Sequence, residues 1–495
     1  MGTTNTTQLI RRIGPRLLLS LILLLPQQVF SLDIDLPDMG DPADALMTPA
    51  AEKRLGRAFI RNLQQRERFV EEAVFEEYIE TLGNKLANQS DDPGRHFRFY
   101  LIENPVVNAF AAPDGHIGVY TGLVLTSQSE SELASVLAHE IAHVTQKHLF
   151  RTFYRAQNMS MPAAMALLAA VLIGVGGGNA QFGQAAVAGI QAGMIQDQIN
   201  YTRHNEEEAD RVGMDILSRS KFDPRAMPAF FKRMGRANQS FSTRLPEFLR
   251  THPVTTNRIA DALGRAGKYP YKQYKENIRY HLLRAWLRYR SFNRPSKAVT
   301  HFKDSLAKGR YRNKDAQEYG YALALTKTKN YSQAHSILSR LLKNKPHIVE
   351  YRLALAQLES KRGNKSTASR LIKEGRRLQP NSKALALGYV DLMQQQGSYK
   401  TAASVISKLI RRYPTDPRLY LKLSRAEGKS GKRADAHAHL AEHYYLQGQL
   451  KSATRQLEIA LREPSLNDYQ SAKFAARLKT IKREYIELEK LRKKR

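Results

Sequence analysis

The stretch that decides the fold of the N-terminal half is residues 139–143, His-Glu-Ile-Ala-His. It lies in a run from Leu133 to His148 whose Ala, Leu, Val, Ile and Glu content predicts a helix. Residues four apart share one helix face, so His139 and His143 can hold one metal ion while Glu140, about 100° round the helix, flanks it. Two neutral histidines and one further protein ligand leave zinc a fourth position for water, whose pKa the metal lowers to about 7. Because the adjacent carboxylate can take the proton, the motif predicts a hydrolytic metal site.

A third ligand is predicted downstream, in the segment from Tyr201 to Ile216. Glu206 and Asp210 are four apart there, so Glu206 can bind zinc while Asp210 hydrogen-bonds a ligand histidine or the backbone. Two alternatives stay open: a helix with two histidines that bind no metal, and an acidic helical turn favoured by the helix dipole. His148 is excluded as a ligand, because it stands about 140° and 180° round the helix from the two motif histidines.

Further motifs on both sides resemble one peptidase family. They are residues 108–117 (Asn-Ala-Phe-Ala-Ala-Pro-Asp-Gly-His-Ile), Gly122-Leu123, Thr251-His252-Pro253 and Arg258-Ile259. With the motifs above, they resemble the gluzincin peptidases of the HtpX, Oma and CAAX-prenyl-protease group, over roughly residues 46–268. The resemblance implies His139, His143 and Glu206 as the ligands of one zinc ion (Zn2+) and Glu140 as the general base. It also implies that His252 and Arg258 approach the active centre.

His252 has alternative roles in this scheme. With Arg258 it can stabilise the tetrahedral oxyanion, or it can reach the zinc ion and occupy the position that the catalytic water needs. It can also belong to a Thr-His-Pro turn before a helix that starts near Thr256. An apolar, Gly-containing insertion at residues 158–199 suggests a lid over the site, with a plain pair of core helices as the alternative. Its apolar run is shorter than the roughly twenty residues that a membrane span needs.

The N-terminus predicts export. Three arginines precede an apolar run at residues 17–25 that is too short to span a bilayer, and small or modest residues follow up to Ser31. Residues 1–31 are interpreted as a signal peptide, with an uncleaved anchor as the alternative, and residues 32–50 as an extended acidic leader. The lack of Cys excludes a lipoprotein. We expect a periplasmic protein of a Gram-negative bacterium, peripheral to the outer membrane.

The mature N-terminal half predicts a small α+β fold. Residues 51–88 show a helical apolar stripe, and residues 97–102 and 116–125 are predicted strands, separated by a turn-rich stretch. The strand before the zinc helix can pair its edge with an extended substrate and lay the scissile bond over the metal. An ordinary structural hairpin is the alternative.

The C-terminal half carries a regular sequence repeat. Three residue types keep one register: Ala334, Ala368, Ala402 and Ala436; Pro346, Pro380 and Pro414; and Gly363, Gly397 and Gly431. The period of about 34 residues is that of the tetratricopeptide repeat, whose stacked helix pairs form a groove that holds a partner or substrate segment. A looser unit contains Trp286 and Ala298. The spacing from Gly448 to Ala453 repeats that of Gly431 to Ala436 after only half a period, which predicts a helix shared by overlapping units.

The chain is strongly basic, with a net charge of +32 from 78 Lys and Arg against 46 Asp and Glu. Such a balance attracts polyanions. No nucleic-acid-binding motif is present and an exported protein meets little nucleic acid, so no nucleic-acid partner is expected. An anionic membrane surface and acidic polypeptide loops are the favoured partners, and a plain solvated surface is the alternative.

These patterns predict a mainly α protein. An α+β zinc metalloprotease domain at residues 51–268, with a small sheet and a zinc-binding helix, is followed at residues 269–495 by an α-helical tetratricopeptide repeat domain with a basic tail. Resemblance to the secreted members of the family that carry such repeats implies an endopeptidase that degrades misassembled, unfolded outer-membrane β-barrel proteins. The repeats would dock it on their assembly machinery. The alternative is a repeat-based assembly chaperone or adaptor with a dormant metal site, and Glu140→Gln separates the two because it removes only the base.

Overall fold

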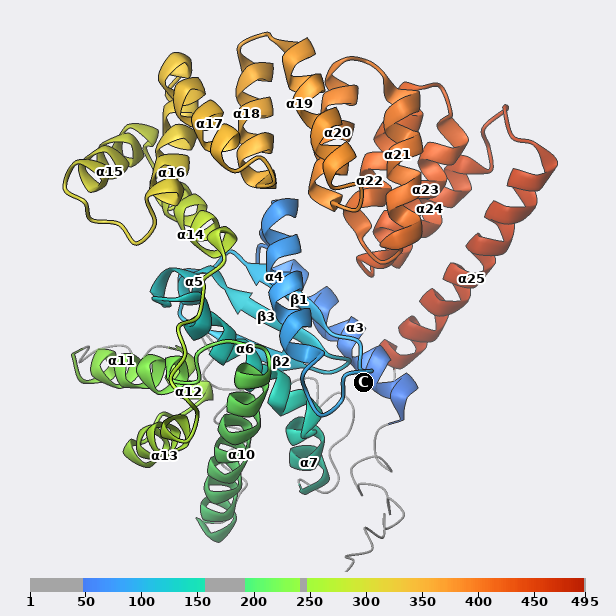
Figure 1. The fold of residues 1–495 in the computed structure, drawn as a ribbon. Coiled ribbons are helices and arrows are strands. Elements are labelled where there is room, and N and C mark those ends of the chain that lie inside the picture. The colour runs from blue at the N-terminus through green and yellow to red at the C-terminus, as the bar shows by residue number, and fades with distance from the viewer. Residues whose placement is uncertain (1–47, 156–191, 241–246, 494–495) are drawn as a thin grey trace, which may run out of the picture. The chain divides into compact units, whose positions relative to one another are not determined.

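The computed structural model describes residues 48–155, 192–240 and 247–493, which are mainly helical (Figure 1). The predicted signal peptide, residues 32–47 of the predicted leader and residues 158–191 of the apolar insertion lie outside the described residues. Within the described ranges, no helix has the length and apolar character needed to cross a membrane. The prediction of a mainly α chain with one small sheet is confirmed.

Two helices occupy the region predicted as helical at residues 51–88. Helix α3 (Pro49–Arg66) includes the last two residues of the predicted leader, and α4 (Ala73–Ala87) follows after a break. Between the two helices the chain runs beside the sheet, where the Val70 N–H donates a hydrogen bond to the Leu101 carbonyl at 2.8 Å. The helical pattern predicted over residues 51–88 is therefore interrupted between the two helices, because this segment pairs with the sheet.

Three strands form the sheet, in the order β1-β3-β2. The central strand is β3 (His116–Tyr120), with β1 (Arg98–Ile102) parallel to it and β2 (Ala109–Ala112) antiparallel to it. The strand predicted at 97–102 is confirmed, whereas β2 lies in a stretch predicted as turns. The strand predicted at 116–125 ends at its fifth residue, because the register pairs Tyr120 with the last residue of β1 and leaves the next residues without a partner strand. They form helix α5 (Thr121–Thr126).

Helix α6 (Glu130–Thr145) is the central helix of the N-terminal half. The Ser129 hydroxyl accepts a hydrogen bond from the Glu132 N–H, which caps the helix start, and acidic residues in the first turn suit the helix dipole. The helix packs against β2, α4, α10 and α11, so nearly all of its residues are buried. The helices that follow it are α7 (His148–Arg155), α10 (Ala192–Arg219), α11 (Ala226–Ser240), α12 (Glu247–Thr251) and α13 (Thr256–Gly267).

Helix pairs fill the C-terminal half. They are α14 (Ile278–Arg290), α15 (Pro295–Ala307), α16 (Lys314–Lys327), α17 (Tyr331–Asn344), α18 (Val349–Lys361), α19 (Lys365–Leu378), α20 (Lys383–Gln395), α21 (Tyr399–Arg412), α22 (Pro417–Lys429), α23 (Arg433–Leu446) and α24 (Leu450–Ala460), followed by α25 (Asp468–Lys493). Three glycines of the repeat register, Gly363, Gly397 and Gly431, follow a first helix with φ of 87°, 73° and 89°, a conformation that glycine adopts readily. Helix α23 packs against both α22 and α24, as α19 and α21 pack against both of their neighbours, so the predicted shared helix stays a prediction.

Helix α4 connects the sheet region to the repeats. It contacts α20, and one hydrophobic cluster continues from α4 to α22. At the edge of this cluster Glu76 forms an ion pair with Arg418, and Nζ of Lys383 lies 2.8 Å from Oδ2 of Asp416. Because the apolar cluster is continuous, the domain boundary at residue 268 stays a prediction.

Candidate metal centre

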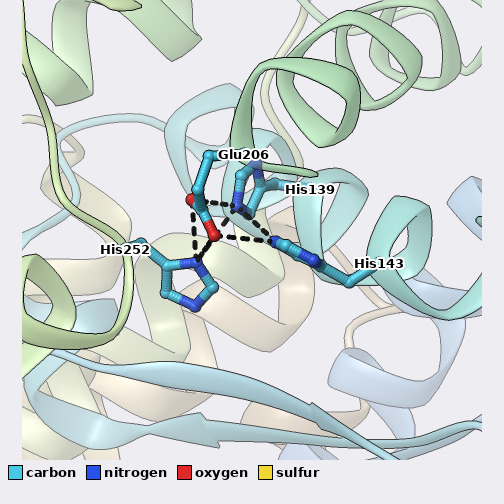
Figure 2. A group of neighbouring side chains, drawn as sticks. All are labelled: His139, His143, Glu206 and His252. Atoms are coloured by element: carbon cyan, nitrogen blue, oxygen red, sulfur yellow. Dashed lines mark hydrogen bonds and ion pairs between the residues drawn. The ribbon is translucent and has the colours of Figure 1, made fainter. Parts of the chain in front are cut away.

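Three separate parts of the chain bring four donor side chains together (Figure 2). His139 and His143 lie on α6, Glu206 lies on α10, and His252 directly follows α12. One nitrogen or oxygen atom from each of the four lies within 4.8 Å of the others. All except His143, which is partly buried, are buried.

The spacing of these donor atoms fits a tetrahedral cation. Nε2 of His139 lies 3.0 Å from Nε2 of His143 and 3.3 Å from Nδ1 of His252. The Glu206 carboxylate lies 3.4 Å from Nε2 of each α6 histidine and 3.0 Å from Nδ1 of His252. Ligands about 2.0–2.1 Å from a tetrahedral zinc ion are about 3.3 Å apart. Imidazole and carboxylate are donors that zinc prefers, so the residues present fit a zinc ion.

Helix α10 reaches the cluster because it crosses α6 closely at Gly213. A Cβ atom at position 213 would lie 3.0 Å from the backbone nitrogen of His139 and 3.1 Å from its Cα. Asp210 and Glu206 lie about one and two turns before this crossing on the same helix. The close approach therefore sets the distance of both carboxylates from His139.

Asp210 and Arg258 are not among the four donors but contact two of the proposed ligands. Oδ1 of Asp210 lies 2.9 Å from Nδ1 of His139, the ring nitrogen that does not join the cluster. Arg258, on α13, donates from Nε and Nη2 to Asp210 at 2.8 Å each, while its Nη1 lies 3.0 Å from Glu206 and donates to the Pro253 carbonyl at 2.7 Å. Every nitrogen of the buried guanidinium thus has a partner. A carboxylate that holds a ligand histidine in this way is typical of metal sites.

Glu140 and His252 face each other beside the cluster. Oε1 of Glu140 lies 3.4 Å from Nε2 of His252, and Glu140 is 1% exposed. His252 presents its other nitrogen, Nδ1, to the donor cluster. Its ring therefore fills the space between the donor cluster and the carboxylate of Glu140.

Comparison with known proteins assigns the family. Residues 74–266 match Peptidase family M48. Over 448 residues the chain is 31% identical to the beta-barrel assembly-enhancing protease of Escherichia coli (strain K12), an alignment that covers 90% of this chain and 91% of that protein. The chain belongs to peptidase family M48.

Two further matches cover smaller parts of this M48 peptidase. The mitochondrial metalloendopeptidase OMA1 of Arabidopsis thaliana is 28% identical over 165 residues, which is 33% of this chain and 30% of that protein. Among solved structures, a tetratricopeptide repeat protein from Parabacteroides merdae matches 51% of this chain and 98% of its own at 14% identity, with a TM-score of 0.28. The resemblance inferred from the motifs is confirmed, and the chain is a metalloendopeptidase.

All seven residues that the sequence singled out lie in or against the cluster of this M48 peptidase. Four form it and three contact a member of it: His139, His143, Glu206 and His252, then Glu140, Asp210 and Arg258. His148, excluded as a ligand by its position on the helix, is outside the four but lies 2.8 Å, Nδ1 to Nδ1, from His143. Its Nε2 lies 3.0 Å from Glu208. The contact between His148 and Glu208 was not predicted from the sequence. Neither was the close helix crossing at Gly213, for which an isolated glycine inside a helical pattern was the only sequence signal.

Burial and neighbouring charged groups shift the pKa values of the donor groups in this M48 peptidase. Burial lowers the pKa of His143 to about 4. Burial alone would also lower the pKa of His139, but Asp210 and Glu206 outweigh it and raise that pKa to about 10. Burial would raise the pKa of Glu206, yet the three facing histidines hold it well below its ordinary value. Burial raises the pKa of Glu140, which makes its carboxylate a stronger base.

Proposed function

We propose that this M48 peptidase is a zinc-dependent endopeptidase with His139, His143 and Glu206 as ligands and Glu140 as general base. The observation that carries the proposal is the set of four donor atoms within 4.8 Å of one another, with the Glu140 carboxylate beside them. When bound there, zinc supplies a Lewis acid that acidifies water and polarises the scissile carbonyl.

The neighbouring side chains are assigned proton transfer and the positioning of the ligands. Glu140 takes a proton from the attacking water on its carboxylate oxygen and returns it to the leaving amide nitrogen, and its raised pKa suits both transfers. Asp210 holds the ring of His139, and Arg258 holds the carboxylates of Glu206 and Asp210. Because its nitrogens are all engaged, we assign Arg258 a positioning role in place of the oxyanion role expected from the sequence.

Strand β2 is the proposed docking edge for an extended substrate. From the sequence this role was expected for the strand before the zinc helix, but β3 is the central strand. In the sheet order β1-β3-β2, β2 lies at an edge, and no other strand of the described residues pairs with its outer side. It packs on α6, and its residue Ala111 contacts the Glu140 carboxylate through the backbone. Main-chain pairing accepts most sequences, which suits an unfolded polypeptide substrate.

His252 is proposed to close the resting site. Its Nδ1 lies among the donor atoms and its Nε2 lies 3.4 Å from Glu140, so the ring occupies the space that the attacking water needs. Catalysis on this view requires His252 to move away, after which it is free to stabilise the oxyanion. The lid expected at residues 158–199 lies mostly outside the described residues, so the closure proposed here rests on His252 alone.

The proposed setting is the periplasm, peripheral to the outer membrane. The relative from Escherichia coli is named for enhancing β-barrel assembly. We propose that this chain acts on unfolded or misassembled outer-membrane β-barrel proteins and meets their assembly machinery through the tetratricopeptide repeats. The second candidate is an assembly chaperone or adaptor with a dormant metal site, and the closed position of His252 is the observation that favours it.

The exchange of Glu140 for Gln tests the proposal, because it keeps every ligand and removes the base. Purified full-length parent and variant would be compared for zinc content and for cleavage of an unfolded barrel polypeptide. We expect equal zinc and the loss of cleavage by a factor of roughly 10² or more in the variant. Glu207→Gln, an exposed exchange one residue from the ligand Glu206, is the matched control. If parent and variant are equally inactive while both support barrel assembly, the chaperone candidate is correct.

A further inference from the structure

Among the six helices α16 to α21, the second helices of three successive repeats carry the whole net positive charge. Helices α17, α19 and α21 have 14 residues each and hold two, five and four basic residues, against one acidic residue in the three together. The basic residues are Arg340 and Lys343; Lys365, Arg370, Lys373, Arg376 and Arg377; and Lys400, Lys408, Arg411 and Arg412. The first helices α16, α18 and α20 each hold equal numbers of basic and acidic residues. Within these six helices the net positive charge therefore lies on the second helices alone.

Most of this charge is exposed and uncompensated. In the described residues, the only one of these cations with an ion pair is Arg340, which contacts Glu318 at 2.9 Å. The single carboxylate, Glu374, lies 3.1 Å from Nη1 of Arg352, whose side chain is 4% exposed. The buried Arg352 thus neutralises Glu374, which is the only acidic residue of these three helices. Solvated surfaces usually mix both signs, so an accumulation of this kind indicates a partner.

Three of the cations share one position in the repeat. Lys343, Arg377 and Arg411 follow one another at the repeat period, and all three are exposed. The buried residues of the same helices keep the same register, with alanines at 334, 368 and 402. Equivalent positions in stacked repeats lie on the same side of the array, so these three side chains form one row. We call the exposed side of α17, α19 and α21 the basic face.

A hollow in the basic face is lined by residues of the kind that bind phosphate. It has a volume of about 640 Å³, and it is lined by the cations Arg370, Lys373 and Arg377 and by the polar residues Ser366, Ser369 and Gln396. Glu374 also lines it, paired with Arg352 as described. Guanidinium, ammonium and hydroxyl groups are the donors that bind phosphate oxygens.

The peptidase half packs against first helices in this part of the array. Helix α4 contacts α20, a first helix, and the Glu77 carboxylate accepts hydrogen bonds from the Ser382 hydroxyl and the Ala384 N–H. First helices also contact one another along the array, from α14 to α20. The described residues of the chain therefore do not supply the acidic partner of the basic face.

We propose that the basic face docks on the phosphate headgroups of an anionic phospholipid bilayer. A specific protein interface needs an apolar core, but Leu378, at 53%, is the only exposed large hydrophobic side chain that these three described helices carry. A bilayer surface needs no such core, because rows of Lys and Arg bind it through charge. The inference deepens the peripheral membrane setting proposed above and rests on that part of the proposed function. It does not depend on the peptidase activity.

Vesicle co-sedimentation of the full chain tests the proposal. The triple variant Arg370→Gln, Lys373→Gln and Arg377→Gln is compared with Lys297→Gln, Lys303→Gln and Lys308→Gln, which removes the same charge from exposed positions at α15. Each basic residue near an anionic surface contributes roughly fivefold to partitioning, so the first triple should weaken binding to phosphatidylglycerol vesicles roughly a hundredfold at low salt. The α15 triple variant should bind phosphatidylglycerol vesicles as the parent does. Phosphatidylcholine vesicles should bind neither the parent nor either triple variant.

Three results would overturn the proposal. The first is an equal loss in both triples, which would mean attraction by net charge alone. The second is unchanged vesicle binding by the first triple together with lost binding to polyglutamate, which would make the basic face a site for acidic protein. The third is the release of the vesicle-bound parent protein by inorganic phosphate, which would make the hollow a site for the free anion. Cleavage of an unfolded polypeptide is measured in parallel and should equal the parent's in both triples, so a failed docking proposal is separable from a failed peptidase proposal.

Discussion

Arg258 and Asp210 form a two-pronged ion pair between α13 and α10, with Nε and Nη2 of the guanidinium each 2.8 Å from a carboxylate oxygen. Both residues are buried, at 3% and 5% exposed. The same carboxylate lies 2.9 Å from His139, and the same guanidinium lies 3.0 Å from Glu206. One ion pair therefore positions two proposed ligands on two different helices.

Arg258→Lys should weaken zinc binding while the fold persists. Lysine keeps the charge but lacks the planar fork that engages both Asp210 oxygens. Loss of such an outer partner typically costs roughly 10–100-fold in metal affinity, measurable by competition with a chelator. Arg265→Lys, at a partly buried position on the same helix, is the control. Unchanged affinity in the first variant would contradict the positioning role.

Gly213→Ala should disturb the metal centre without touching a ligand. The new methyl group meets the His139 backbone at 3.0 Å, so α10 must move away by a few tenths of an ångström, which carries Glu206 from its place. We expect weaker zinc binding and a lower unfolding temperature. Gly264→Ala is the matched control, since no atom lies within 4 Å of its added Cβ and alanine favours a helix by roughly 1 kcal/mol. A Gly213 variant with parental zinc affinity would show that the crossing does not set the site.

Single alanine exchanges should separate ligands from neighbours. His139→Ala, His143→Ala and Glu206→Ala should each lower the zinc content of the purified protein. His148→Ala should retain zinc, because that ring contacts His143 on its side away from the cluster. The ligand assignment fails if the His148 variant loses zinc and the Glu206 variant keeps it.

His252→Ala should raise peptidase activity if the ring closes the resting site. The variant keeps three donors and opens the position beside Glu140, so self-cleavage or cleavage of an unfolded substrate should increase several-fold. The double variant His252→Ala, Glu140→Gln should lose this gain, which excludes a contaminating protease. A zinc-loaded, stably folded His252 variant that is no more active than the parent would rule out gating and leave His252 a role in the transition state or in structure.

His116 should make stability depend on pH. It is 3% exposed and interacts with the Tyr100 hydroxyl at 2.9 Å, and burial lowers its pKa from 6.5 to about 4. The unfolded chain binds a proton below pH 6.5 that the folded chain does not. The contribution of the neutral His116 to the free energy of unfolding is therefore complete above pH 6.5. It is lost as the pH falls towards 4, and the loss at pH 5 is roughly 2 kcal/mol. Denaturant unfolding at pH 7 and pH 5 should show a smaller pH-dependent loss for His116→Gln than for the parent, and equal losses would refute the assignment.

The sequence by itself determined the features that repeat or that depend on local spacing. The His-Glu-Ile-Ala-His motif predicted a helix with both histidines on one face, because helical periodicity fixes side-chain direction over a few residues. The repeat register predicted the helix pairs, since each repeat buries the same positions, such as Ala334, Ala368 and Ala402. The family also followed from short motifs.

Only the tertiary structure decided how distant parts meet. Glu206 and His252 both come far along the chain from His143, and no local periodicity relates them to α6. Their positions depend on the close crossing at Gly213 and on the ion pair of Arg258, which are contacts between helices. The sheet likewise differed from expectation, because which strand lies at the edge is set by pairing with β1, a separate segment of the chain. Local sequence fixes the direction of a side chain within its own helix, whereas packing between elements fixes which side chains share a site.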